Sequence, residues 1–155
     1  MKYKMKRKDL ATKEEIWNAV ITVMAEYNFP TENEVANDIY MVYTYYSELE
    51  SGGHESLLNW FSGHIEEVGI TNYVRNLTSI LDKIGAHDYA KIEKEYGEKL
   101  WSLFQALEND EAAEGDFYQV IEKADQAYQN LNGQLEKLLE HYFVKVYENI
   151  IEIVE

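Results

Sequence analysis

Two side chains that can transfer protons lie within otherwise apolar helical patterns. His64 shares a predicted helix face with Phe61, and Asp125 falls between Ile121 and Tyr128. A buried carboxylate needs hydrogen-bond donors, because an unpaired one costs several kcal/mol or shifts its pKa. One hypothesis makes the two residues an acid/base pair, and the other makes them a satisfied polar contact that fixes the register of two helices. We prefer the second, because the sequence contains no nucleophile elbow, phosphate loop or dinucleotide fingerprint.

The sequence predicts no metal site and no cofactor. The chain has no cysteine, and its four histidines are too scattered to form a recognisable metal-binding motif. His64 and Glu67 are three residues apart and could share a helix face, but one such pair is common by chance. The absence of cysteine also fits a reducing compartment, so we expect a cytoplasmic protein.

Acidic residues are concentrated in two stretches that contain no lysine or arginine. The chain has a net charge of −15, and the 61 residues from Glu14 to Val74 hold eleven acids and no base. A second base-free window, from Leu100 to Glu122, holds six acids. Carboxylates that no cation neutralises suit contact with a basic partner. The acids that we expect to make such contacts are Glu48, Glu50, Glu55, Glu108, Asp110, Glu111, Glu114 and Asp116.

The sign of this charge indicates the class of partner. A strongly negative surface repels nucleic acid and anionic membranes, and it speeds the encounter with basic proteins. The sequence also lacks an apolar run of about 18 residues that could span a membrane. We therefore expect a basic protein partner, either a DNA-binding protein or a toxin, and no direct contact with nucleic acid or membrane. The alternative interpretation is that the charge only keeps the protein soluble.

Three of these acids, Glu108, Glu111 and Glu114, are spaced by three residues. On a helix they would form a ridge of like charges about 5–6 Å apart, which destabilises the helix slightly and would point to a function. A helix that begins in this segment would instead favour acids in its first turn through its dipole. The sequence leaves both interpretations open.

Helical periodicity and capping signals run through most of the chain. Thr12 to Glu15 has the pattern of a capping box, and Thr31 to Glu34 repeats that pattern directly after Pro30. The segment Ser51-Gly52-Gly53 interrupts the helical pattern, and Gly85 lies where a helix C′ glycine is expected. Together with the single proline, these signals predict an all-α fold, a single-domain bundle of about seven helices.

The two ends of the chain differ from the middle. Residues 1–13 carry six bases and one acid, and we expect residues 1–10 to form a basic, flexible tail. Residues 11–155 are expected to form the single helical domain. Its last helix is predicted to run from Leu135 to about Val154, with Val146, Ile150 and Ile153 on its apolar face.

One segment resembles a known family. The run Ser51-Gly52-Gly53-His54-Glu55-Ser56-Leu57-Leu58-Asn59-Trp60-Phe61 is similar to a Gly-Gly-aromatic segment of a bacterial all-α family related to DNA-mimic proteins. The run Leu77–Ala86 resembles the following helix of that family, which ends in Ile-Gly-Ala. The similarity extends from Tyr45 through Tyr142. Ser51 and His54 stand where the family carries an asparagine and an aromatic residue.

The resemblance bears on the fold, and the function is inferred from it only together with the charge map. In the family's characterised mimic, a dimer presents carboxylates that are spaced like DNA phosphates, and these occupy a DNA-binding protein. For this chain, the two base-free acidic stretches on a mimic-like fold favour a non-enzymatic acidic binding protein that masks a basic protein surface. One form of this hypothesis is a DNA mimic that acts on a DNA-binding protein, and the resemblance is compatible with a homodimer. The first alternative is an immunity or antitoxin-type protein that neutralises a basic toxin. The second alternative is a hydrolase that uses His64 and Asp125.

Overall fold

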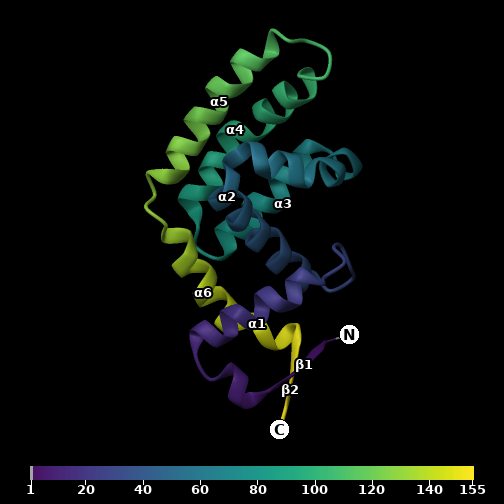
Figure 1. Ribbon diagram of the computed structural model, residues 1–155, viewed down its shortest axis with the longest axis vertical. Coiled ribbons are helices and arrows are strands. Elements are labelled where there is room, and N and C mark those ends of the chain that lie inside the picture. The colour runs from purple at the N-terminus through teal and green to yellow at the C-terminus, as the bar shows by residue number, and fades with distance from the viewer. Residues whose placement is uncertain (1) are drawn as a thin grey trace. The chain divides into compact units, whose positions relative to one another are not determined.

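The computed structural model describes residues 2–155, and this part of the chain is mainly helical (Figure 1). Its α-helices are α1 (Lys13–Ala25), α2 (Glu34–Val68), α3 (Ile70–Lys83), α4 (His87–Ala106), α5 (Ala113–Gln129) and α6 (Gln134–Val146). Two short strands, β1 (Tyr3–Lys6) and β2 (Ile151–Val154), lie near the chain ends. A 3-10 helix follows β1 at Arg7–Leu10, and another precedes β2 at Tyr147–Asn149. The predicted all-α fold is confirmed, with six helices over residues 2–155 in place of about seven.

The described chain divides into two compact units. The central unit is Thr44–Leu135, and it contains most of α2 together with α3, α4 and α5. The terminal unit comprises the residues before Thr44 and the segment Glu136–Glu155, so it contains α1, the start of α2, most of α6 and both strands. That residues 11–155 form a single domain stays a prediction. No helix within residues 2–155 is long and apolar enough to cross a membrane.

The terminal unit joins the two ends of the chain in a parallel pair of strands. Tyr3 pairs with Ile151 and Lys6 with Val154, and Figure 1 shows the purple β1 beside the yellow β2. β1 therefore lies within the segment that the sequence predicted to be a flexible tail. The predicted last helix is wrong beyond Val146, because the β-branched run after it forms β2 instead of another helical turn.

Capping at the start of two helices is partly as predicted. The Thr12 hydroxyl accepts a hydrogen bond from the Glu15 backbone N–H at 3.1 Å, so the predicted N-cap of α1 is confirmed. At the start of α2, the residue that caps the helix is Asn33 and not the predicted Thr31. Its Oδ1 accepts from the backbone N–H of Ala36 at 3.0 Å, and α2 begins one residue after it.

A kink divides α2 at the predicted break. Gly53 has a φ of 70° and a ψ of −162°, which lie outside the helical region. Both halves of the predicted helix pair are present, but they are continuous apart from this residue, which explains why the helix number is lower than predicted. The kink changes the direction of the chain between the first and second halves of α2.

The core of the central unit is built from apolar stripes on four helices. Leu57, Phe61, Leu81, Leu100 and Phe117 are among its buried side chains. Gly85 closes α3 as predicted: its φ is 88°, and the N–H of the next residue donates to a carbonyl of the last helical turn at 2.7 Å, as in a Schellman motif. At Gly97 of α4, a Cβ would lie 2.9 Å from Cγ2 of Val74, so this glycine allows α3 and α4 to pack closely.

Candidate functional site

Most of the negative charge belongs to the central unit. Residues 44–135 contain seventeen acids and six bases, for a net charge of −11. The terminal unit contains twelve acids and eight bases, for a net charge of −4, and it includes the basic N-terminal segment. The field that could attract a basic partner is therefore produced mainly by the central unit.

The three candidate acids on α2 are held by neutral hydroxyl groups. The phenol of Tyr118 donates to Oε2 of Glu55 at 2.7 Å, and the phenol of Tyr128 donates to Oε2 of Glu50 at 2.9 Å. The third acid, Glu48, accepts a short hydrogen bond from the hydroxyl of Ser56. Both tyrosines belong to α5. Since a hydroxyl donor carries no charge, these contacts orient the carboxylates without neutralising them.

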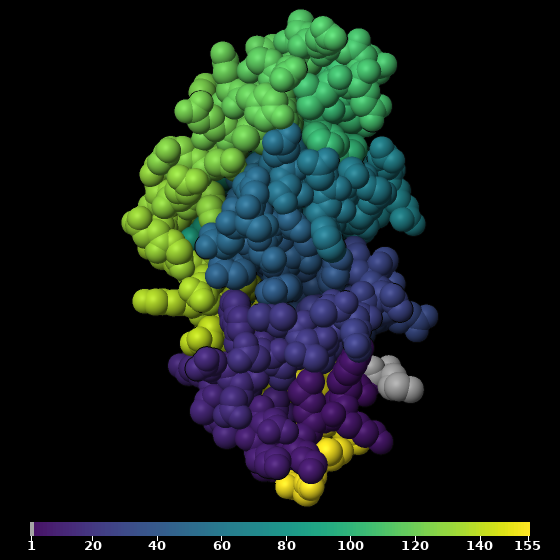
Figure 2. All heavy atoms as spheres, viewed as in Figure 1, coloured from purple at the N-terminus to yellow at the C-terminus, as the bar shows by residue number. Residues whose placement is uncertain are grey.

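The other five candidate acids lie at the junction of α4 and α5. Glu108, Asp110 and Glu111 are exposed in the turn between the helices, and Glu114 and Asp116 are exposed in the first turn of α5. The helical ridge suggested by the spacing of 108, 111 and 114 does not form, because the first two of these positions are not helical. The two acids in α5 instead lie where the helix dipole favours negative charge. In Figure 2 the green atoms of this segment cover one end of the central unit.

Tyr118 connects the two groups of acids. Its side chain is 43% exposed, and the hydrogen bond to Glu55 is the largest cause of a raised phenol pKa. The charge of Glu114 raises the pKa of the same phenol further, so acids from α2 and from the start of α5 act on one ring. We use the term acidic surface for Glu48, Glu50, Glu55, Glu108, Asp110, Glu111, Glu114 and Asp116.

Lysine and arginine side chains of the described part of the chain pair with acids outside the acidic surface. Within residues 2–155, none of its eight carboxylates forms an ion pair with lysine or arginine. Lys94 of the central unit pairs with Asp82 at 3.3 Å, and Arg7 of the terminal unit pairs with Glu155 at 3.0 Å. No basic side chain of residues 2–155 therefore offsets the negative charge of this surface by a direct ion pair.

A second polar cluster is buried in the central unit around His54. The Nε2–H of His54 donates to Oε2 of Glu93 at 2.8 Å, and its Nδ1–H donates to Oδ1 of Asp125 at 2.7 Å. The backbone N–H of His54 donates to the same oxygen of Asp125 at 2.8 Å. The phenol of Tyr45 also donates to Glu93, at 2.9 Å. These contacts join α2, α4 and α5, and we call the four residues the His54 cluster.

The electrostatics of the His54 cluster favour a charged imidazole. Burial by itself would lower the pKa of His54, whose side chain is 1% exposed. The charge of Glu93 and the hydrogen bonds to both carboxylates outweigh burial, and they raise the pKa to about 10. Both ring nitrogens of His54 are engaged by carboxylates in this buried position. The arrangement suits a contact that locks three helices.

The kink in α2 positions this histidine. Gly53 precedes His54, and a Cβ at position 53 would overlap the carboxylate of Asp125, with its Cγ 2.9 Å away. Only glycine satisfies both this close approach and the φ of 70°. The Gly-Gly motif therefore has a physical role: it brings the backbone and the ring of His54 onto one carboxylate.

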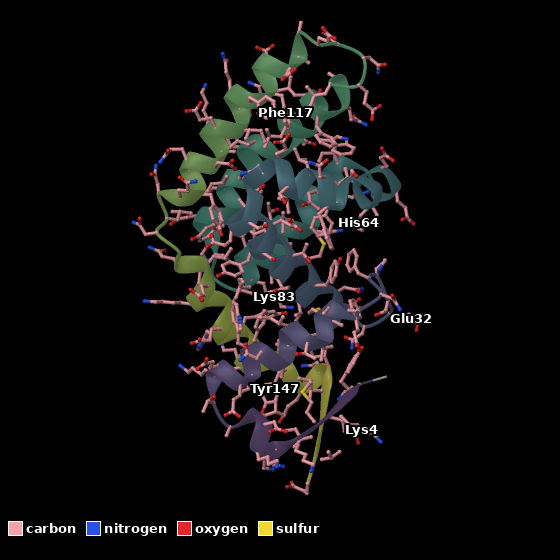
Figure 3. All side chains as sticks on the ribbon, viewed as in Figure 1. Lys4, Glu32, His64, Lys83, Phe117 and Tyr147 are labelled. Atoms are coloured by element: carbon pink, nitrogen blue, oxygen red, sulfur yellow. The ribbon has the colours of Figure 1, made fainter. Side chains whose placement is uncertain are left out.

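The histidine that pairs with Asp125 is His54 and not the His64 of the sequence analysis. His64 lies on the second half of α2, labelled in Figure 3, with its ring centroid 6.0 Å from that of Phe61. Burial lowers its pKa. The expectation that Asp125 is satisfied by internal donors is confirmed, although its partner differs. The sequence analysis identified neither His54 nor Glu93 as part of such a cluster. Two signals could have pointed to it: Gly52-Gly53 directly before His54, and Glu93 four residues after Tyr89 on a predicted helix.

Comparison with known proteins gives one finding about the family. The family model described as DMP19-like protein matches residues 31–146. This range contains the whole central unit and helices α2 to α6, whereas β1, α1 and β2 lie outside it. No curated protein and no solved structure matches the chain.

Proposed function

The chain belongs to the DMP19-like protein family, whose name refers to a DNA mimic, and on this premise we propose that it masks the DNA-binding surface of a basic protein. In this proposal the protein is not an enzyme. Its carboxylates take the places of nucleic-acid phosphates, and its partner is a DNA-binding protein.

One observation carries the proposal: the eight carboxylates of the acidic surface have no lysine or arginine partner within the described chain. If a carboxylate already formed an internal ion pair, that pair would have to be broken before a partner could bind. The net gain in binding free energy from replacing one ion pair by another would then be small. Here the internal hydrogen-bond donors are side-chain hydroxyl groups and, for Asp110, a backbone N–H, and none of them carries a charge. A partner's arginine or lysine therefore gains the full attraction of each carboxylate. Binding of this kind weakens as salt rises, because salt screens both surfaces.

The arrangement of the acids also supports a match to duplex DNA. Tyr118 and Tyr128, which orient Glu55 and Glu50, are ten residues apart on α5 and thus about 15 Å apart along the helix axis. Each strand of duplex DNA carries a charge about every 3.4 Å, so this length corresponds to roughly four base pairs. A DNA-binding surface that contacts four or more base pairs could therefore contact both of these carboxylates.

The experiment compares two variants that lose the same charge. The first replaces the five acids between α4 and α5 by their amides, at Glu108, Asp110, Glu111, Glu114 and Asp116. The control replaces five exposed or half-buried acids of the terminal unit by glutamine, at Glu14, Glu136, Glu140, Glu148 and Glu152. Each protein is used to capture partners from its source lysate at low and high salt. The captured protein is then tested for displacement from DNA.

We expect the unmodified protein and the control to displace the partner from DNA with similar affinity, and the first variant to be at least about tenfold weaker. If both variants lost affinity for the partner to the same extent, only net charge would matter, and the proposed surface would be refuted. Capture of a basic nuclease that the protein inactivates would instead support the antitoxin-type alternative. The homodimer remains a prediction, which sedimentation of the captured complex would test.

A further inference from the structure

The terminal unit contains a cavity that the acidic surface does not use. Its volume is about 710 Å³, and it is bordered by β1, by the segment between α1 and α2, and by Ile150 just before β2. Figure 3 labels Glu32 on this connecting segment. Cavities of about 300–1,000 Å³ typically bind small organic molecules. Tyr3, Val23 and residues 26–28 of the lining lie outside the range that the family model matches.

The charge of the lining is of one sign. Glu26 and Glu32 are the ionisable acids of the described lining, which includes no lysine, arginine or histidine. Glu26 is also the C-cap of α1, so the last carbonyl groups of that helix add partial negative charge at the same end. A ligand that enters this cavity therefore meets two carboxylates and the negative end of a helix.

The walls of the cavity are held in place by their own hydrogen bonds. The phenol of Tyr3 donates to Oε2 of Glu26 at 2.8 Å, which leaves Oε1 to accept from a ligand. The phenol of Tyr27 donates to Oδ1 of Asn37 at 2.6 Å, which fixes the orientation of its ring. Asn33 donates from Nδ2 to the carbonyl of Asn149 at 3.3 Å and so ties the wall to the C-terminal segment. A preorganised wall loses little entropy when a ligand binds.

These features define one chemical class of ligand. Carboxylates attract a cation, the two phenols offer aromatic faces and oxygen acceptors, and the apolar side chains of Val23, Ala36 and Ile150 suit a short aliphatic chain. We propose that the cavity binds a small organic cation with a primary ammonium or guanidinium group on an aliphatic chain. The cation is either a free aliphatic amine or the side chain of a lysine or arginine that a partner presents. The site is independent of the proposed DNA mimicry, because it lies in the other unit.

The test must distinguish a specific binding site from the general attraction of an acidic protein for cations. The full chain is titrated calorimetrically with putrescine and agmatine at about 150 mM salt, where long-range attraction is screened. The neutral isostere of putrescine, 1,4-butanediol, tests the need for charge. Acetyl-lysine amide and acetyl-arginine amide represent the side chain of a partner.

Two double variants with equal net charge complete the test. One carries Glu26→Gln and Glu32→Gln in the cavity, and the control carries Glu14→Gln and Glu136→Gln at exposed positions of the same unit. We expect saturable binding of one cation per chain, no binding of butanediol, and affinity that is at least about tenfold weaker in the cavity variant but within about twofold in the control. In NMR spectra, the backbone amides whose chemical shifts change most on binding should be those of residues 3, 26–33 and 150.

Each outcome decides the proposal. Binding of the free amines would identify the natural cation as a small molecule. Binding of the acetylated amino acids alone would identify it as a side chain of a partner protein. Either result supports the cavity as a cation-binding site. Equal weakening in the two double variants would overturn the proposal, because net charge would then explain the binding. The absence of saturable binding by any of the four cations would overturn it as well.

Discussion

Replacing His54 by glutamine would remove the positive charge that lies between two carboxylates in the central unit. His54 bonds Glu93, whose side chain is 4% exposed, and Asp125, whose side chain is 25% exposed. Glutamine can donate to one of them but brings no charge. Breaking a buried ion pair by removing one partner typically costs about 3–5 kcal/mol, because the remaining charge is left uncompensated.

The raised pKa of His54 gives a second estimate of the free energy that this histidine contributes to stability. The folded value is about 10 and the ordinary value is 6.5, a difference of roughly 3.5 units or about 5 kcal/mol. Because the folded pKa is the higher one, this stabilisation is complete below pH 6.5 and is lost as the pH rises toward 10. At pH 8 about 3 kcal/mol remains, so the two routes agree.

The assay is urea unfolding, followed by circular dichroism between pH 6 and pH 9, together with an NMR titration of the histidine rings. We expect His54→Gln to lower the free energy of unfolding by about 3–5 kcal/mol at neutral pH. The control is His141→Gln at an exposed position of α6, which should change stability by less than about 0.5 kcal/mol. In the unmodified protein, the His54 ring should still be protonated at pH 8.

A double variant distinguishes charge imbalance from simple loss of packing. Adding Glu93→Gln to His54→Gln removes the uncompensated carboxylate, and it should recover part of the lost stability, about 1–2 kcal/mol. The reasoning would be refuted if His54→Gln cost less than about 1 kcal/mol. It would also be refuted if the His54 ring lost its proton near its ordinary value of 6.5.

Three further substitutions, one of them with a matched control, test the local structure by urea unfolding. Gly53→Ala should cost at least about 2 kcal/mol, because its φ is positive and a Cβ overlaps Asp125, whereas Gly63→Ala, with open space around its Cβ, should stabilise α2 by up to about 1 kcal/mol. Tyr128→Phe should cost about 1–2 kcal/mol, since its carboxylate partner on α2 loses a hydrogen-bond donor; no loss would argue against that contact. Thr12→Ala should cost about 1 kcal/mol through the lost N-cap of α1, and an unchanged midpoint would contradict the assignment of the cap.

Features that depend on neighbouring residues could be predicted from the sequence. The N-cap at Thr12, the C′ glycine at Gly85 and the break at Gly53 were all predicted, because each follows from the conformational preference of one residue and its neighbours within a turn. The apolar stripes identified the helices for the same reason. The charge map also comes from the sequence alone, since it requires only the order of the residues.

Features that depend on distant residues were decided by the tertiary structure. The end of the last helix was mispredicted because β2 pairs with β1 from the opposite end of the chain, and no local pattern records that partner. The apolar surroundings of Asp125 showed that it needed a donor, but His54 reaches it because the non-helical Gly53 lets the backbone approach the Asp125 carboxylate closely. Periodicity places a side chain on a helix face, whereas its partner depends on how separate helices pack against each other.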